Sequence, residues 1–267
     1  MNVYLLNPLA MNSENHPKIQ TESGLLKKDQ LNDYTFARVN LPTSGFAIRL
    51  SEVLAFRADH AAARDAIFTP FEIQKIKDNI QPVCKDTIET SSQATSKEVY
   101  LKRPDLGKLL DEPSKTKLKE CTSKQKDVAI IISNGLSAAA VNENAAQFLN
   151  HFIPQLLEGN ISITPIIFAS NARVALSDEI GALLETKLSI ILVGERPGLS
   201  SPDSMSAYFT YAPEVGLTDE SRNCISNIRI KGLPPIQASE KLFYLVNASL
   251  TKKISGVHLK DDMGLLE

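Results

Sequence analysis

The sequence predicts an α/β protein with a doubly wound, mainly parallel sheet that follows a helical N-terminal region. An apolar run rich in β-branched residues, Leu188 to Val193, leads directly into a Gly/Pro loop at 194–199. This is typical of a buried parallel strand that ends at the carboxyl edge of a sheet. From residue 128 onward, strand-like and helix-like patterns alternate with short connections, which indicates parallel strands joined by right-handed crossovers.

The pattern before residue 127 predicts a mobile leader and then a mainly helical part. The leader is assigned to residues 1–33, because most of it is polar, short of aromatic residues and without a hydrophobic period. A helix is expected from Ser51, as its N-cap, to Ile67, with small residues that permit close packing against another helix. The lysine-rich run 115–127 is the expected domain boundary, so the helical region covers 34–126.

Residues 127–267 are expected to form a Rossmann-like domain. Ser137 and Ser177 are suitable N-caps for its first two helices, since serine hydroxyls accept hydrogen bonds from the first free amides. The expected elements are, in order, a strand at 128–132, a helix from 137 to about 152, a strand at 161–168 with its exit loop at 171–174, a helix from 177, a strand at 188–193 and a final helix from about 236 to 252.

Composition limits the classes of partner. The 29 basic and 31 acidic residues give a net charge of −2, which offers no electrostatic attraction for nucleic acid or an anionic membrane. Three dispersed cysteines suit neither a disulfide framework nor a zinc site. The first residues lack the pattern of a secretion signal, and no apolar run reaches the roughly 18 residues of a membrane span. We therefore expect a cytoplasmic protein.

Common catalytic and nucleotide-binding motifs are missing. The loop 133–137 lacks the three glycines of a dinucleotide fingerprint, and no phosphate loop or hydrolase motif occurs. His60 is interpreted as structural, because Arg64 stands at the i+4 position where a second metal ligand would be needed.

Three loops are expected to converge at the sheet edge: 172–174, 195–198 and 223–227. Their amide, hydroxyl, carboxylate and guanidinium groups suit hydrogen bonding to a large, amide-rimmed ligand better than acid/base chemistry. Cys224 is interpreted as a lining residue, because a nucleophilic cysteine needs a histidine base. An alternative remains open, in which Glu195 and Arg196 are ordinary surface ion-pair residues and the glycines only shape a turn.

Distinctive segments lie in order along the chain and share one resemblance. They are 194–200, 204–208, 211–213 and 222–228, together with 60–66, 100–107, 133–137, 173–174, 178–181 and 255–257. From about Phe36 to Asp262 the sequence closely resembles the small subunit of ethanolamine ammonia-lyase.

The resemblance implies a non-catalytic subunit that holds adenosylcobalamin (coenzyme B12) against a large, barrel-shaped catalytic subunit. In the family, dimethylbenzimidazole stays on cobalt, and an adenosyl radical converts ethanolamine to acetaldehyde and ammonia in the large subunit. The chain also lacks the Asp-x-His-x-x-Gly pattern that supplies a histidine to cobalt, so no metal ligand and no catalytic residue are expected here. Proteins generally bind and orient such cofactors, and the cofactor carries the chemistry.

Carried over position by position, the resemblance places the cobalamin contacts on Val174, Glu195 and Cys224, with Arg173 and Arg196 beside them. The family often has Gly-Arg-Val where this chain has Ala172-Arg173-Val174, so the backbone there is less permissive.

The resemblance also implies a partner, the large subunit. The helix at 51–67 is the expected docking element, although packing within its own domain is equally compatible with its small residues. Packaging in a bacterial microcompartment stays open. Two other interpretations remain: an independent α/β module that binds a nucleotide or another small ligand, and a purely structural partner that holds no cofactor.

Overall fold

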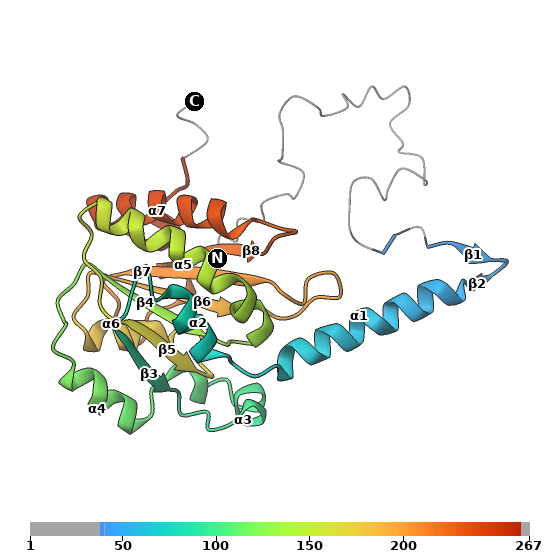
Figure 1. The fold of residues 1–267 in the computed structure, drawn as a ribbon, viewed down its shortest axis with the longest axis horizontal. Coiled ribbons are helices and arrows are strands. Elements are labelled where there is room, and N and C mark those ends of the chain that lie inside the picture. The colour runs from blue at the N-terminus through green and yellow to red at the C-terminus, as the bar shows by residue number, and fades with distance from the viewer. Residues whose placement is uncertain (1–37, 40, 263–267) are drawn as a thin grey trace.

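The computed structural model describes residues 38–39 and 41–262, and in them the predicted α/β class is confirmed. One six-stranded sheet has the order β3-β5-β4-β6-β7-β8, with helices on both faces (Figure 1). The expected leader lies outside the described residues. The strands are β3 (Thr87–Ser91), β4 (Val128–Ser133), β5 (Ile166–Ser170), β6 (Leu188–Gly194), β7 (Met205–Tyr211) and β8 (Arg222–Ile228).

The sheet is mixed, so the prediction of a doubly wound, mainly parallel, Rossmann-like sheet is confirmed only in part, for the α/β class and four parallel strands. Strands β3, β5, β4 and β6 are parallel, whereas β7 and β8 run antiparallel to their neighbours. A parallel return needs a crossover of about a dozen residues or more. The segment 195–204 after β6 is short and contains no helix, so the chain returns antiparallel.

Three helices of the predicted alternation are present. Helix α5 (Ala138–Glu158) begins after Ser137, whose hydroxyl accepts a hydrogen bond from the Ala140 amide as predicted. Helix α6 (Leu176–Leu183) begins earlier than expected, with Ala175 at its cap and Ser177 inside its first turn. Helix α7 spans Pro235–Lys252.

Two apolar layers hold these elements together. Alternate residues of β4 point to opposite faces: Ile130 packs with α5 and α7 on one face, and Ile131 packs with α6 on the other. Helix α2 (Ile73–Ile80) adds to the first layer, and α4 (Glu112–Glu120) adds to the second. On the second face, Tyr208 in β7 and Cys224 in β8 remain partly exposed.

The region before residue 127 contributes to the sheet as well as to helices. Strand β3 was not predicted and pairs in parallel with β5, while the lysine-rich run forms most of α4. The short helix α3 (Lys97–Lys102) lies between them in the chain. The division into two domains at residue 127 therefore stays a prediction, and strand β3 of the sheet lies before that residue.

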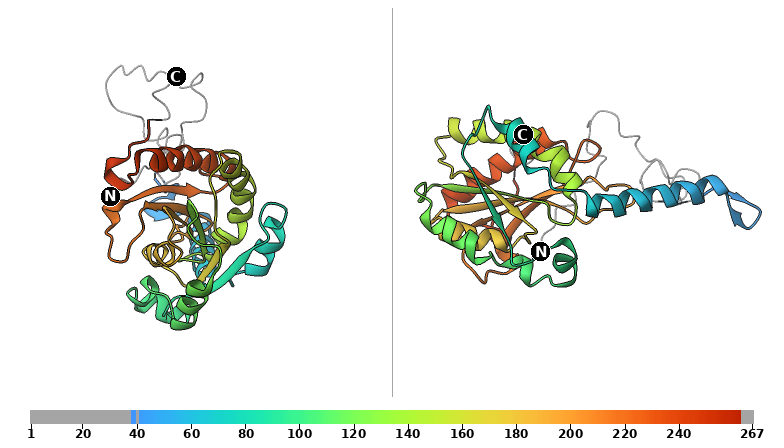
Figure 2. Two further views of the ribbon diagram at one scale, coloured as in Figure 1. Left: turned by 90° about the vertical axis from the view of Figure 1, so that its left-hand side faces the viewer. Right: turned by 60° about the horizontal axis from the view of Figure 1, so that its bottom comes forward.

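The predicted N-terminal helix is confirmed as α1 (Leu50–Phe68), although it begins at Leu50 with Arg49 at its cap instead of Ser51. A small hairpin, β1 (Thr43–Ser44) with β2 (Ala47–Ile48), precedes it. The hairpin and α1 project from the body of the molecule (Figures 1 and 2). We call residues 43–68 the arm. Ala66 is the buried residue of α1.

In the described part of the chain, no helix combines the length and apolarity that a bilayer crossing requires.

Candidate functional site

Glu195 follows β6 and has both carboxylate oxygens fixed by the chain itself. The hydroxyls of Ser204 and Ser206 donate to its two oxygens, and the amide of Asn227 donates to Oε1 at 3.2 Å. The Glu195 amide in turn donates to the Ser204 carbonyl at 2.9 Å. These bonds come from β7, β8 and the loop between β6 and β7, so the carboxylate has one orientation. A carboxylate offers about four acceptor positions, so with two bonds on Oε1 and one on Oε2, one position on Oε2 is left for a ligand.

The backbone just before Glu195 passes through a very close approach. A Cβ on Gly194 would lie 1.9 Å from the Ser137 carbonyl oxygen, so only glycine fits between β6 and the loop after β4. This packing fixes the point at which the chain leaves the sheet, and therefore the position of the Glu195 backbone.

Cys224 lies on β8 directly opposite Tyr208 on β7, and the two side chains are hydrogen-bonded. Burial and then the nearby Glu195 charge raise the pKa of the Cys224 thiol to about 12, against hydrogen bonds from Tyr208 and Ser206 that lower it. Burial likewise raises the pKa of Tyr208. Both groups are therefore protonated at neutral pH, and a protonated thiol is a poor nucleophile. The structure brings Glu195 and Cys224 into one polar cluster.

Sequence reasoning gave no role to Ser204, Ser206 or Tyr208. The signal was present, because Met205-Ser206-Ala207-Tyr208 alternates apolar and polar residues, as a strand with one buried face does. In β7, Met205 and Ala207 belong to the core on one face, so Ser206 and Tyr208 point to the other.

Val174 lies between β5 and α6 and packs against the same buried apolar cluster as Tyr208. Val174 and Cys224 are thus both connected to the second face of the sheet, because Tyr208, which is hydrogen-bonded to Cys224, packs against the same cluster as Val174.

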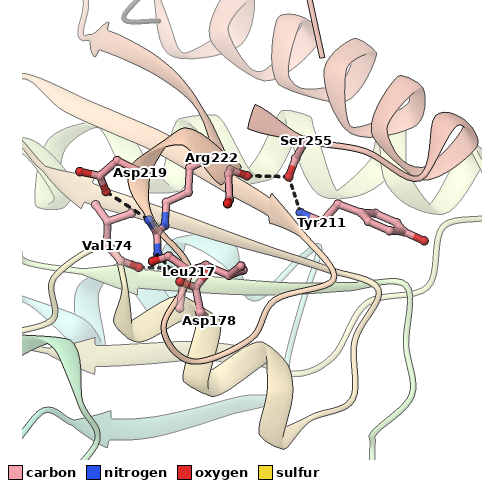
Figure 3. Close-up of polar contacts among 9 residues, drawn as sticks. Val174, Asp178, Tyr211, Leu217, Asp219, Arg222 and Ser255 are labelled. Atoms are coloured by element: carbon pink, nitrogen blue, oxygen red, sulfur yellow. Dashed lines mark hydrogen bonds and ion pairs between the residues drawn. The ribbon is translucent and has the colours of Figure 1, made fainter. Parts of the chain in front are cut away.

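A buried ion pair fixes β8 against α6 (Figure 3). Arg222 in β8 pairs with Asp178 in α6, and their side chains are only 3% and 1% exposed. The same guanidinium donates to the Leu217 carbonyl at 3.0 Å and to Asp219 at 3.1 Å. Because Cys224 belongs to β8 and Val174 lies just before α6, this pair holds β8, with Cys224, against the helix that follows Val174.

Arg173 is directed toward another partner. Its guanidinium stacks over the Tyr100 ring at 4.1 Å and donates to the Tyr100 carbonyl at 3.0 Å. Gly107 leaves room for it, since a Cβ there would lie 2.8 Å from Arg173 Cγ. No hydrogen bond or ion pair within the described residues joins Arg173 to Glu195 or Cys224.

Arg196 is exposed, and among the described residues its side chain has no hydrogen bond or ion pair. Glu195 instead uses its oxygens for Ser204 and Ser206. The simple ion pair that the sequence left open is therefore not formed within the described chain.

No metal site is evident in the described ranges, where no three His, Cys, Asp or Glu side chains gather closely enough to hold an ion. His60 lies exposed on α1, with its ring 6.4 Å from that of Phe56.

Comparisons with known proteins all point to one family. Residues 27–260 match the family described as ethanolamine ammonia-lyase light chain (EutC). The chain is 43% identical over 255 residues to an ethanolamine ammonia-lyase small subunit of Pseudomonas aeruginosa (strain UCBPP-PA14), covering 94% of this chain and 92% of that protein. It is 42% identical over 236 residues to the Azotobacter vinelandii protein of the same name, covering 87% of each.

Proposed function

Since the chain belongs to the ethanolamine ammonia-lyase light-chain family, the small subunits of a lyase, we propose that it holds adenosylcobalamin against a large catalytic subunit. The resemblance predicted from the sequence is thereby confirmed at the level of the family. The proposal concerns what this subunit does in the enzyme: it binds and orients the cofactor and supplies no catalytic residue.

The observation that carries the proposal is the fixed carboxylate of Glu195. Two hydroxyls and one amide hold it, yet Oε2 keeps one acceptor position and the residue is partly exposed. Corrin side chains end in neutral amides, which donate hydrogen bonds and carry no charge. A preoriented acceptor suits such donors, because little conformational entropy is lost on binding.

The neighbouring groups fit the same role. Cys224 and Tyr208 stay protonated, so they line the site without acting as bases or nucleophiles. Val174 adds an apolar surface next to α6, and its carbonyl is already used by the amide and hydroxyl of Ser177. When bound, adenosylcobalamin supplies an adenosyl radical for the conversion of ethanolamine to acetaldehyde and ammonia. The residues of this chain hold the cofactor in register with the partner, and Arg173 and Arg196 are proposed to assist as flanking contacts.

We further assign the docking of the large subunit to the arm. It exposes large apolar side chains: Phe46, Ile48, Leu50, Leu54, Phe56 and Phe68. Soluble proteins seldom expose so many along one element unless a partner covers them. The arm belongs to the region 34–126 to which docking was assigned from the sequence. The alternative, in which α1 packs into its own domain, is less favoured because Ala66 is its buried residue.

The parallel strands β3 to β6 then serve as a Rossmann-like platform, and the antiparallel pair β7 and β8 carries the cofactor contacts. A cytoplasmic location, with packaging in a microcompartment as a further option, belongs to the same proposal. An independent nucleotide-binding module has no specific support, since the sheet edge carries no phosphate loop.

Ethanolamine deamination with added adenosylcobalamin tests the proposal. The large subunit alone, this chain alone and the co-expressed pair are compared. Activity only in the pair, with cobalamin retained by the pair, is expected. If the two subunits form a stable but inactive complex that retains no cobalamin, this chain has only a structural role. If they form no complex, the large subunit is not the partner of this chain.

A further inference from the structure

Two cations lie over one aromatic ring, that of Tyr100, near the carboxyl edge of the parallel strands. Lys97 Nζ lies 5.3 Å from the centre of the Tyr100 ring, and Arg173 Cζ lies 4.1 Å from it. Lys97 and Tyr100 belong to α3, and Arg173 follows β5. Cations over the face of a tyrosine ring are attracted by it, but the ring carries no net charge that would compensate them.

Neither cation has an acidic partner in the described residues. Lys97 donates to the carbonyls of Gly135 at 2.8 Å and Leu136 at 3.4 Å, and Arg173 donates to that of Tyr100. The Nε of Arg173 is buried and has no hydrogen-bond partner. Burial and then the Arg173 charge lower the pKa of Lys97 to about 8. Two such charges repel each other, and an anion bound by both would relieve that repulsion.

The cation pair lies next to the proposed cofactor site. Arg173 directly precedes Val174, and Lys97 contacts the loop after β4. That loop is also hydrogen-bonded to Gly194, the residue before Glu195, because the Leu136 amide donates to the Gly194 carbonyl at 3.0 Å. Loops at this edge of open α/β sheets are where ligands bind.

We propose that Lys97 and Arg173 bind the phosphodiester of the cobalamin nucleotide loop. This inference rests on the proposed function and adds the part of the ligand that the two cations recognise. The peripheral amides of cobalamin are neutral, whereas its phosphodiester is anionic. An arginine guanidinium can donate two parallel hydrogen bonds to a phosphate, and a lysine ammonium adds a compact positive charge; both commonly bind phosphate.

The test compares two ligands on the complex of this chain with its large subunit. Adenosylcobalamin contains the nucleotide loop, and adenosylcobinamide lacks that loop and its phosphate. Dissociation constants are measured by equilibrium dialysis for wild type, Lys97→Met, Lys97→Arg and the matched control Lys102→Met. Lys102 is exposed on the same helix. Arg173 is left unchanged because its stacking holds Tyr100.

Lys97→Met is expected to weaken adenosylcobalamin binding about tenfold and to leave adenosylcobinamide binding unchanged; tenfold corresponds to about 1.4 kcal/mol. Lys97→Arg should keep most of the affinity, and Lys102→Met all of it. Equal weakening for both ligands would show that Lys97 only supports the fold, and no weakening would show that it does not touch the ligand; either result overturns the inference and leaves the proposed function standing. Failure of the wild-type complex to bind either ligand would overturn both.

Salt provides a second readout. Contacts between a lysine and a phosphate weaken as salt rises, because the charges are screened. The wild-type affinity for adenosylcobalamin should therefore fall more steeply with NaCl than that of Lys97→Met. Equal slopes would contradict a charged contact.

Discussion

Glu195, the proposed cofactor contact, shows at the scale of single side chains how neighbouring residues orient a carboxylate. Its position after a buried strand was predictable, because an apolar run that ends in Gly-Glu-Arg-Pro indicates a strand and then a loop. Its hydrogen bonds to Ser204 and Ser206 were not, since they depend on the register of β7 against β6. Likewise the contact between Arg173 and Tyr100 joins residues far apart in sequence, and no local pattern encodes it.

Cys224 provides a residue-scale prediction. Because its pKa is raised to about 12, alkylation by iodoacetamide at pH 8 should be more than about 100-fold slower in the folded, cofactor-free complex than in the urea-unfolded chain. Peptide-resolved mass spectrometry measures both rates at this cysteine. A folded-state rate similar to the unfolded one would mean that a reactive thiolate is present.

At the scale of elements, the ion pair between Arg222 and Asp178 joins β8 to α6. Asp178→Ala should lower the free energy of unfolding by about 3–5 kcal/mol, since it leaves the buried Arg222 charge without its main partner. Asp219→Ala is the matched control, because Asp219 binds the same guanidinium but is 77% exposed, and it should cost less than about 1 kcal/mol. Urea unfolding measures both. Similar small losses for the two variants would show that the buried pair does not stabilise the junction.

A second element-scale prediction concerns the start of β4. Burial raises the pKa of Asp127, but hydrogen bonds from Lys187 and Ser162 outweigh it and lower that pKa to about 2. A carboxyl whose folded pKa is depressed stabilises the fold above its unfolded pKa of about 3.9, and this stabilisation is lost as the pH falls toward 2.

Asp127→Asn should therefore be less stable than wild type by about 2 kcal/mol at pH 6, and the difference should narrow at pH 3. Urea unfolding at the two pH values measures it. A difference that stays constant with pH would show that the Asp127 charge is not involved.

The limits of prediction at this scale follow from the connections. The alternation between residues 128 and 193 identified three parallel strands, because each is followed or preceded by a helix with its own period. Strands β7 and β8 were not predicted as strands, because they contain few β-branched residues and follow loops rich in Gly, Pro, Ser or other polar residues. Strand β3, with the sequence TIETS, is short and mostly polar, and it pairs only at the sheet edge.

At the scale of the whole molecule, the arm exposes apolar side chains that the body of the fold does not cover. Phe46 is fully exposed, and Leu50 is 71% exposed. The double variant Phe46→Ser with Leu50→Ser should weaken association with the large subunit at least tenfold, since it removes apolar area from the proposed interface. The thermal stability of the chain alone should hardly change.

Val215→Ser is the matched control, because Val215 is an exposed apolar residue outside the arm. Association is measured by titrating the large subunit with each variant in analytical ultracentrifugation. Unaltered association of the double variant would place the large subunit on another surface.

The central claim is that this chain holds cobalamin through the fixed Glu195 carboxylate. The most direct measurement is the dissociation constant of adenosylcobalamin for the assembled two-subunit complex, with wild type, Glu195→Ala and the exposed control Glu214→Ala. We expect Glu195→Ala to bind at least tenfold more weakly while the complex still assembles, and Glu214→Ala to match wild type. Equal affinity for all three complexes would contradict the account.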